Sequence, residues 1–211
     1  KFQGDIYSPR GHKYVRDFIA DPAPKIVYRV GGVVLEKESL LIEKEEQILI
    51  RYTVKESDVP VKLRFRPFLA FRNMHQLSKA NLYANTKAVI MPNGAKIRLY
   101  DGYPFLHMQF SKHADFVPVP DWYYGIEYNK ELRRGYDYKE DLFVPGYFEL
   151  EANKGDVIIF SASTAKANPE QLKRKYTLEL SKRIPRDSFK HCLINAAQQF
   201  FIKRNKKTEI I

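Results

Sequence analysis

The feature that most constrains this chain is the alternation of apolar and polar residues over short segments. Val61, Leu63 and Phe65 alternate with cationic side chains, which is the two-residue period of a strand with one buried face. Segments of this kind recur about nine times, and most are joined by short turns rich in Gly, Asn or Pro. Short strands joined by tight turns fold as antiparallel sheets. The sequence therefore predicts a mainly β protein built as a large antiparallel β-sandwich.

Several neighbouring segments have the spacing of β-hairpins. Gly31-Gly32 lies between two apolar runs and is typical of a two-residue hairpin turn. Two more hairpins are predicted, from Thr86–Met91 and Lys96–Tyr100 around Pro92-Asn93-Gly94, and from Tyr147–Ala152 and Val157–Ser161 around Asn153-Lys154-Gly155.

Near the C-terminus the apolar period lengthens. A last strand is predicted over Lys175–Lys182, where Tyr176, Leu178 and Leu180 share one face. An amphipathic helix is then predicted from about Asp187 to about Lys203. Its apolar positions are Phe189, Cys192, Leu193, Ala196, Ala197 and Phe200. Because the single cysteine stands at one of these positions, we interpret it as a core residue rather than a nucleophile.

The segment Asp121–Phe148 follows neither period and is rich in both aromatic and charged residues. A long aperiodic segment in a compact domain is typically a functional or docking loop. Sugar rings stack on exposed aromatic side chains, and carboxylates and arginines hydrogen-bond sugar hydroxyls. The segment therefore contains candidates for contact with carbohydrate or with another domain. They are Trp122, Tyr123, Tyr124, Glu131, Arg134 and Glu140. The three rings would form a sugar platform, and Arg134 would fix a hydroxyl or pair with Glu140. The alternative is that the rings pack under the loop while the charges pair at its rim.

A second polar segment, between the predicted strands, adds two candidates. Arg72 and His75 lie in the loop that follows the strand at Val61–Phe65. His75 either hydrogen-bonds the loop backbone or contacts substrate or a neighbouring domain. No histidine has the spacing of a metal site, and the sequence has no nucleotide-binding fingerprint, so we expect neither a metal nor a cofactor.

The balance of charges permits one further class of partner. Lys and Arg number 36 against 25 Asp and Glu, which gives a net charge of +11. Such a charge is compatible with nucleic-acid binding, but the cations are scattered through strand-like segments. One cysteine allows no intrachain disulfide, which is compatible with the cytoplasm. No run reaches the roughly 18 apolar residues of a membrane span.

Four stretches of the chain carry a resemblance to a known family. They are SPRGHKYVRDFIADPAPKIVYRVGGVVLEKESLLIEKEEQILIRYTV, RFRPFLAFRNMHQLSKAN, DWYYGIEYNKELRRGYDYKEDLFVPGYFEL and AAQQFFIKRNKKTEII, and together they resemble the N-terminal domain of bacterial and archaeal glycogen debranching enzymes. The third holds Trp122-Tyr123, the Tyr-x-x-Glu pattern Tyr128–Glu131, Arg134-Gly135 and Glu140-Asp141-Leu142. Their order and spacing carry the resemblance, which covers nearly the whole chain.

The resemblance implies a specific organisation. Residues 1–185 would form a sandwich of the supersandwich, galactose mutarotase-like kind, lacking its first strands. Residues 186–211 would form a linker helix and tail that lead to a catalytic α/α toroid in the same parent chain. The toroid of the family hydrolyses α-1,6 branch points of glycogen-like glucans with two carboxylates.

On this interpretation the chain carries no catalytic residue and requires no cofactor, and its partners are the toroid and an α-glucan. The parent activity would be amylo-α-1,6-glucosidase; whether it also includes 4-α-glucanotransferase stays open. Two alternatives are a free-standing carbohydrate-binding module, which a terminal linker helix disfavours, and a basic nucleic-acid-binding domain, which only the net charge favours.

Overall fold

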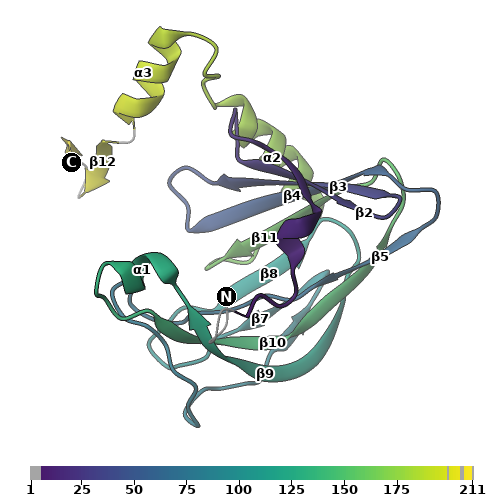
Figure 1. The fold of residues 1–211 in the computed structure, drawn as a ribbon, viewed down its shortest axis with the longest axis vertical. Coiled ribbons are helices and arrows are strands. Elements are labelled where there is room, and N and C mark those ends of the chain that lie inside the picture. The colour runs from purple at the N-terminus through teal and green to yellow at the C-terminus, as the bar shows by residue number, and fades with distance from the viewer. Residues whose placement is uncertain (1–5, 199, 205–206, 211) are drawn as a thin grey trace.

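Two antiparallel sheets form the body of the protein. A computed structural model describes residues 6–198, 200–204 and 207–210 and is 43% strand and 16% helix (Figure 1). The first sheet has eight strands in the order β1 (Val15–Ile19), β2 (Lys25–Val30), β3 (Val33–Leu41), β4 (Gln47–Glu56), β11 (Val157–Ser163), β8 (Leu106–Phe110), β7 (Gly94–Ile97) and β6 (Val89–Met91). The second has three, in the order β5 (Val61–Phe65), β10 (Lys139–Ala152) and β9 (Asp115–Glu127). The predicted mainly β, two-sheet fold is confirmed.

The local patterns correspond to these strands. β2 and β3 pair across Gly31-Gly32 as a hairpin, and β6 and β7 pair across the turn at Asn93, so both predicted turns are confirmed. In β5, Val61, Leu63 and Phe65 pack against the core while Lys62 and Arg64 face solvent. The core between the sheets is lined by fully buried aromatic rings, including Phe110, Phe143 and Phe148.

The predicted hairpin across Asn153–Gly155 is wrong. β10 pairs with β5 and β9 in the three-stranded sheet, whereas β11 pairs with β4 and β8 in the other sheet. The turn therefore carries the chain from one sheet to the other. A hairpin turn and a turn between sheets contain the same residue types, because both demand a tight reversal. Only the side chains on the two inner faces decide between them.

The segment Asp121–Phe148 is not one long loop. It contains the second half of β9, the short helix α1 (Asn129–Arg133) and the first part of β10. The two strands pair closely, but the register shifts between Glu140 and Leu142 and between Val144 and Gly146. Each irregularity interrupts the alternation of inward and outward side chains, which explains why the sequence shows no two-residue period here.

A helix replaces the strand predicted at Lys175–Lys182. After the 3-10 turn η2 (Pro169–Gln171), α2 covers Leu172–Ser181. Leu172 and Tyr176, four residues apart, are buried against the outer side of the eight-stranded sheet, while Leu178 faces solvent. The predicted strand is wrong because Tyr176, Leu178 and Leu180 alternate in the sequence, whereas the buried residues Leu172, Tyr176 and Glu179 have the four- and three-residue spacing of a helix. A second 3-10 turn, η1 (Gly11–Tyr14), precedes β1.

The C-terminal helix begins where it was predicted and ends sooner. α3 covers Phe189–Gln198, and the Ser188 hydroxyl accepts a hydrogen bond from the His191 amide at its start. Residue 199 lies outside the described residues, and the chain then forms β12 (Phe201–Arg204) and β13 (Lys207–Ile210), which pair with each other. The predicted helix to Lys203 is therefore too long. Residues 205, 206 and 211 of the predicted tail lie outside the described residues.

α3 stands apart from both sheets (Figure 1). Its apolar side chains are exposed, with Phe189 at 79% and Leu193 at 54%. Cys192 is exposed too, so its interpretation as a core residue is wrong. The periodicity identified an apolar helix face correctly, but nothing in the described part of the chain covers it. None of the described helices combines the length and apolarity that a membrane crossing requires.

Candidate functional site

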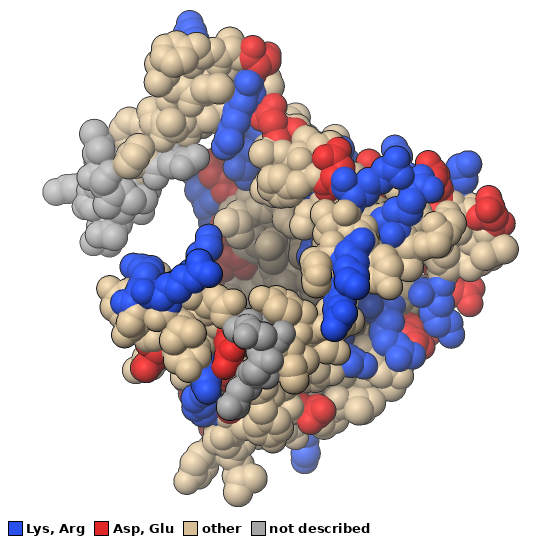
Figure 2. Space-filling view, viewed as in Figure 1, with Lys and Arg blue, Asp and Glu red and all other residues tan. Residues whose placement is uncertain are grey.

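A cleft opens where the long loop after β5 meets α1. It has a volume of about 680 Å³ and is lined by Arg72, Met74, His75, Leu77, Tyr128, Glu131, Arg134, Tyr136 and Asp137. The loop supplies one wall, and α1 with the turn behind it supplies the other. Figure 2 shows a hollow on the face where α1 lies, with Lys and Arg side chains on the α1 side of it. We call the space between the loop and α1 the cleft.

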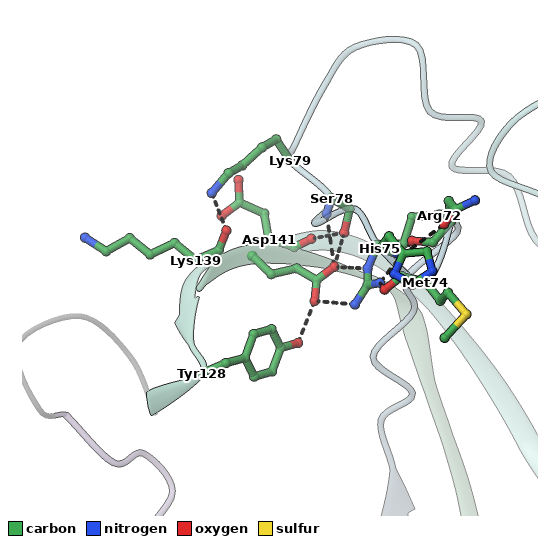
Figure 3. Close-up of polar contacts among 10 residues, drawn as sticks. Arg72, Met74, His75, Ser78, Lys79, Tyr128, Lys139 and Asp141 are labelled. Carbon is green, nitrogen blue, oxygen red and sulfur yellow. Dashed lines mark hydrogen bonds and ion pairs between the residues drawn. The ribbon is translucent and has the colours of Figure 1, made fainter. Parts of the chain in front are cut away.

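A buried carboxylate joins the two walls. Glu140, at the start of β10, is fully buried and accepts hydrogen bonds from both sides of the cleft. The Arg72 guanidinium donates from Nε to Oε1 and from Nη2 to Oε2, and the Tyr128 hydroxyl also donates to Oε2. The amide and hydroxyl of Ser78 donate at 3.0 and 2.9 Å. Figure 3 shows Arg72, Ser78 and Tyr128 converging from separate segments.

The same contacts fix the charge of this carboxylate. Burial by itself raises the pKa of Glu140, but the bonds from Arg72, the Ser78 amide and the Tyr128 hydroxyl outweigh it and lower the pKa to about 2. Burial, and then the bond to Glu140, raise the pKa of Tyr128 to about 12. The bond to Glu140 also raises the pKa of Arg72. Glu140 is therefore an anion, and Arg72 a cation, throughout the physiological range.

Asp141, the next residue of β10, is hydrogen-bonded to β9 and to the loop at 72–80. Its two carboxylate oxygens accept hydrogen bonds from the amides of Gly125, at 2.8 Å, and Ala80, at 3.1 Å. Gly125 has φ of +64° and lies where β9 bulges opposite Asp141. The Asp141 amide donates to the Ser78 carbonyl, and the Ser78 hydroxyl shares its one proton between Glu140 and the Asp141 carbonyl, 2.8 Å away. Two adjacent acidic residues thus tie the loop at 72–80 to both long strands.

The comparison with protein families agrees with this architecture. Residues 1–159 match the family model described as the glycogen debranching enzyme N terminal. The chain belongs to this family. The search of curated proteins gave no match. Buried Glu140 and partly buried Asp141 are the acidic residues of the Glu140-Asp141-Leu142 motif, so that motif has a structural role in this debranching-enzyme N-terminal domain.

Four of the candidate residues meet in the cleft of this N-terminal domain. Arg72 and His75 lie on the loop wall, and Glu131 and Arg134 lie on the α1 wall. Arg134 Nη1 lies 3.5 Å from Glu131 Oε1, and its guanidinium lies over the ring of Tyr136. The alternative in which Arg134 pairs with Glu140 is therefore wrong, because the nearer Arg72 occupies that buried carboxylate.

The three aromatic candidates of β9 do not form one platform. Trp122 points inward and packs edge-on against Phe143, with ring centres 5.3 Å apart. Tyr123 points outward, packs against Phe68 and bonds Arg66. Tyr124 is 63% exposed at the bulge. Successive side chains of a strand point to opposite faces, so three consecutive rings cannot share a surface.

Sequence reasoning missed several residues of the site. Ser78, Tyr128, Tyr136 and Asp137 lie within the stretches that carry the resemblance, but no local pattern gave them a role. The partners of Glu140 are 62 and 68 residues away at Ser78 and Arg72, so no local pattern identifies them. Among the described residues, no group of three or more His, Cys, Asp or Glu could hold a metal ion.

Proposed function

We propose that this chain is the non-catalytic N-terminal β-domain of a glycogen debranching enzyme, and that its cleft forms one side of the substrate groove. The observation that supports this most is the cleft itself. Its walls are held by a buried, ionised Glu140, while polar groups of Arg134, His75 and Tyr136 line the open space. Such donors and acceptors, with rings beside them, suit the hydroxyls of a glucan.

Three carboxylates in or behind the walls of the cleft are unsuited to hydrolysis. Cleavage of a glycosidic bond requires one carboxyl that stays protonated near neutral pH and a second that is ionised. Glu140 has a pKa of about 2 and is buried beneath the wall, so it cannot act as the acid. Glu131 pairs with Arg134, and the carboxylate of Asp141 accepts two backbone amides. These groups support the frame of the cleft.

We infer the roles of the two parts of the chain from its membership of the family. Residues 1–185 would act as the sandwich domain and residues 186–211 as the linker to a catalytic α/α toroid. The exposed apolar face of α3 offers a surface on which that toroid would pack. We infer amylo-α-1,6-glucosidase as the activity of the parent enzyme, acting on glycogen-like glucans in the cytoplasm.

Two experiments test the proposal. The chain alone should release no glucose from a branched dextrin; release that Glu131→Gln or Glu140→Gln abolishes would place the active site on this chain. The chain should then be joined to the α/α domain of a glycogen debranching enzyme. Arg134→Met should raise KM for the dextrin several-fold with kcat nearly unchanged, and Lys62→Met, which removes a cation outside the cleft, should change neither. An unchanged KM for Arg134→Met would contradict a role in the groove.

A further inference from the structure

A second organised surface lies on the outer face of the three-stranded sheet. Here Arg64, Arg66, Phe68, Tyr123 and Tyr147 form a continuous series of contacts, which we call the outer row. The Arg64 guanidinium lies 4.2 Å from the centre of the Tyr147 ring, and that of Arg66 lies 6.0 Å from the same centre. Arg66 Nη1 donates to the Tyr123 hydroxyl at 2.6 Å, and Tyr123 packs edge-on against Phe68.

The outer row is ordered although it faces solvent. Arg64 is held from Nε and Nη2 by one oxygen of Glu149, on the neighbouring strand, so its planar group stays stacked on Tyr147. Arginine and tyrosine fixed in this way lose little further conformational freedom when a ligand binds. Among the described residues, Arg66 forms no ion pair, and its only hydrogen bond is the one to Tyr123. The side chains therefore present a pre-arranged set of flat surfaces with unused donors and acceptors.

The charge of this face indicates what it can bind. Strand pairing places Lys62 beside Glu151, and Arg64 beside Glu149, which in turn pairs with Asp115. With Arg66 included, three cations meet three carboxylates, and the sum is +3 − 3 = 0 in a chain whose net charge is +11. The carboxylates would repel a polyanion. A neutral polyhydroxyl chain, in contrast, can donate hydrogen bonds to the carboxylates and accept them from the neighbouring cations.

We propose that the outer row binds a segment of neutral α-glucan, at a site separate from the cleft. This inference rests on the proposed function for the identity of the polymer. A branched glucan presents many chain ends, so a second weak site would hold the enzyme on the polymer while the groove works on another chain. Arg66 and the Tyr123 hydroxyl would bond sugar hydroxyls, and the Arg64 guanidinium stacked on Tyr147 would support the flat side of a sugar.

The test is co-sedimentation of the chain with glycogen, with maltoheptaose as competitor. Arg66→Met keeps the length of the side chain and removes its donors, and we expect it to weaken glycogen retention about tenfold. Lys62→Met on the same strand and face is the matched control and should bind like the original chain. Retention should persist in 0.5 M NaCl, because the ligand is uncharged. Equal denaturation curves for both variants would confirm that folding is unaffected.

Each other outcome overturns the inference and separates it from the proposed function. If only Arg134→Met weakens glycogen retention, the cleft binds glucan and the outer row does not. If the chain shows no retention, the outer row is no glucan site, while the KM experiment on the joined enzyme still decides the role of the cleft. If Arg66→Met changes sedimentation of the chain alone and leaves glycogen retention intact, the outer row is a protein interface.

Discussion

Replacing Glu140 with glutamine tests whether the buried anion holds the cleft together. The carboxylate is fully buried and accepts five hydrogen bonds. Its pKa lies at about 2 against an ordinary value of 4.5. Each unit of difference in pKa corresponds to about 1.4 kcal/mol. Ionised Glu140 therefore contributes roughly 3 kcal/mol to the free energy of unfolding at neutral pH. Glutamine keeps the shape but leaves the half-buried Arg72 cation without its anion, which costs a similar amount.

The pH dependence gives this prediction its sign. Because folding lowers the pKa of Glu140, its contribution is fully present above pH 4.5 and is lost as the pH falls toward 2. The difference in the free energy of unfolding between the original chain and Glu140→Gln should therefore be about 3 kcal/mol at pH 7 and about half of that at pH 3. Urea denaturation at the two pH values measures it.

A matched control separates burial from charge. Glu149 also pairs with an arginine, but Arg64 is largely exposed, so Glu149→Gln should cost less than about 1 kcal/mol at either pH. A loss below about 1 kcal/mol for Glu140→Gln at pH 7, or an equal loss at both pH values, would refute the reasoning. In that case Arg72 and the loop at 72–80 would be held by packing, and the cleft would not depend on the anion.

Three further predictions concern other parts of the fold. A Cβ added to Gly146 would lie 2.1 Å from a backbone oxygen of β9, so Gly146→Ala should lower the free energy of unfolding by more than about 2 kcal/mol, while Gly11→Ala, with nothing within 4 Å, should change it little. Tyr176→Phe removes a donor from buried Glu38 and should cost about 2 kcal/mol in urea denaturation; a loss below about 0.5 kcal/mol would contradict this. The exposed apolar face of α3 should make the chain self-associate, and Leu193→Lys should reduce that association in light scattering; a strictly monomeric original chain would count against it.

Features that depend on neighbouring residues could be predicted from the order of the amino acids. The alternation in β5 gave a strand with a buried face, Gly31-Gly32 gave a hairpin, and the apolar spacing after Ser188 gave the start of α3. These follow from the two-residue period of a strand, the three-to-four-residue period of a helix and the backbone freedom of glycine. The mixture of aromatic and charged residues in Asp121–Phe148 pointed to Glu131, Arg134 and Glu140 as candidates, and the polar loop after Val61–Phe65 pointed to Arg72.

Which distant segments and side chains meet could not be predicted in this way, because it depends on how the two sheets pack. The turn at Asn153–Gly155 leads to a different sheet because the strands on either side of it find distant partners. Tyr176 belongs to a helix because Leu172 and Tyr176 bury together on the outer side of the large sheet. Glu140 pairs with Arg72 rather than Arg134 because the loop after β5 folds back onto the start of β10. Long-range contacts of this kind depend on the arrangement of whole sheets, and no periodicity in the local sequence encodes them.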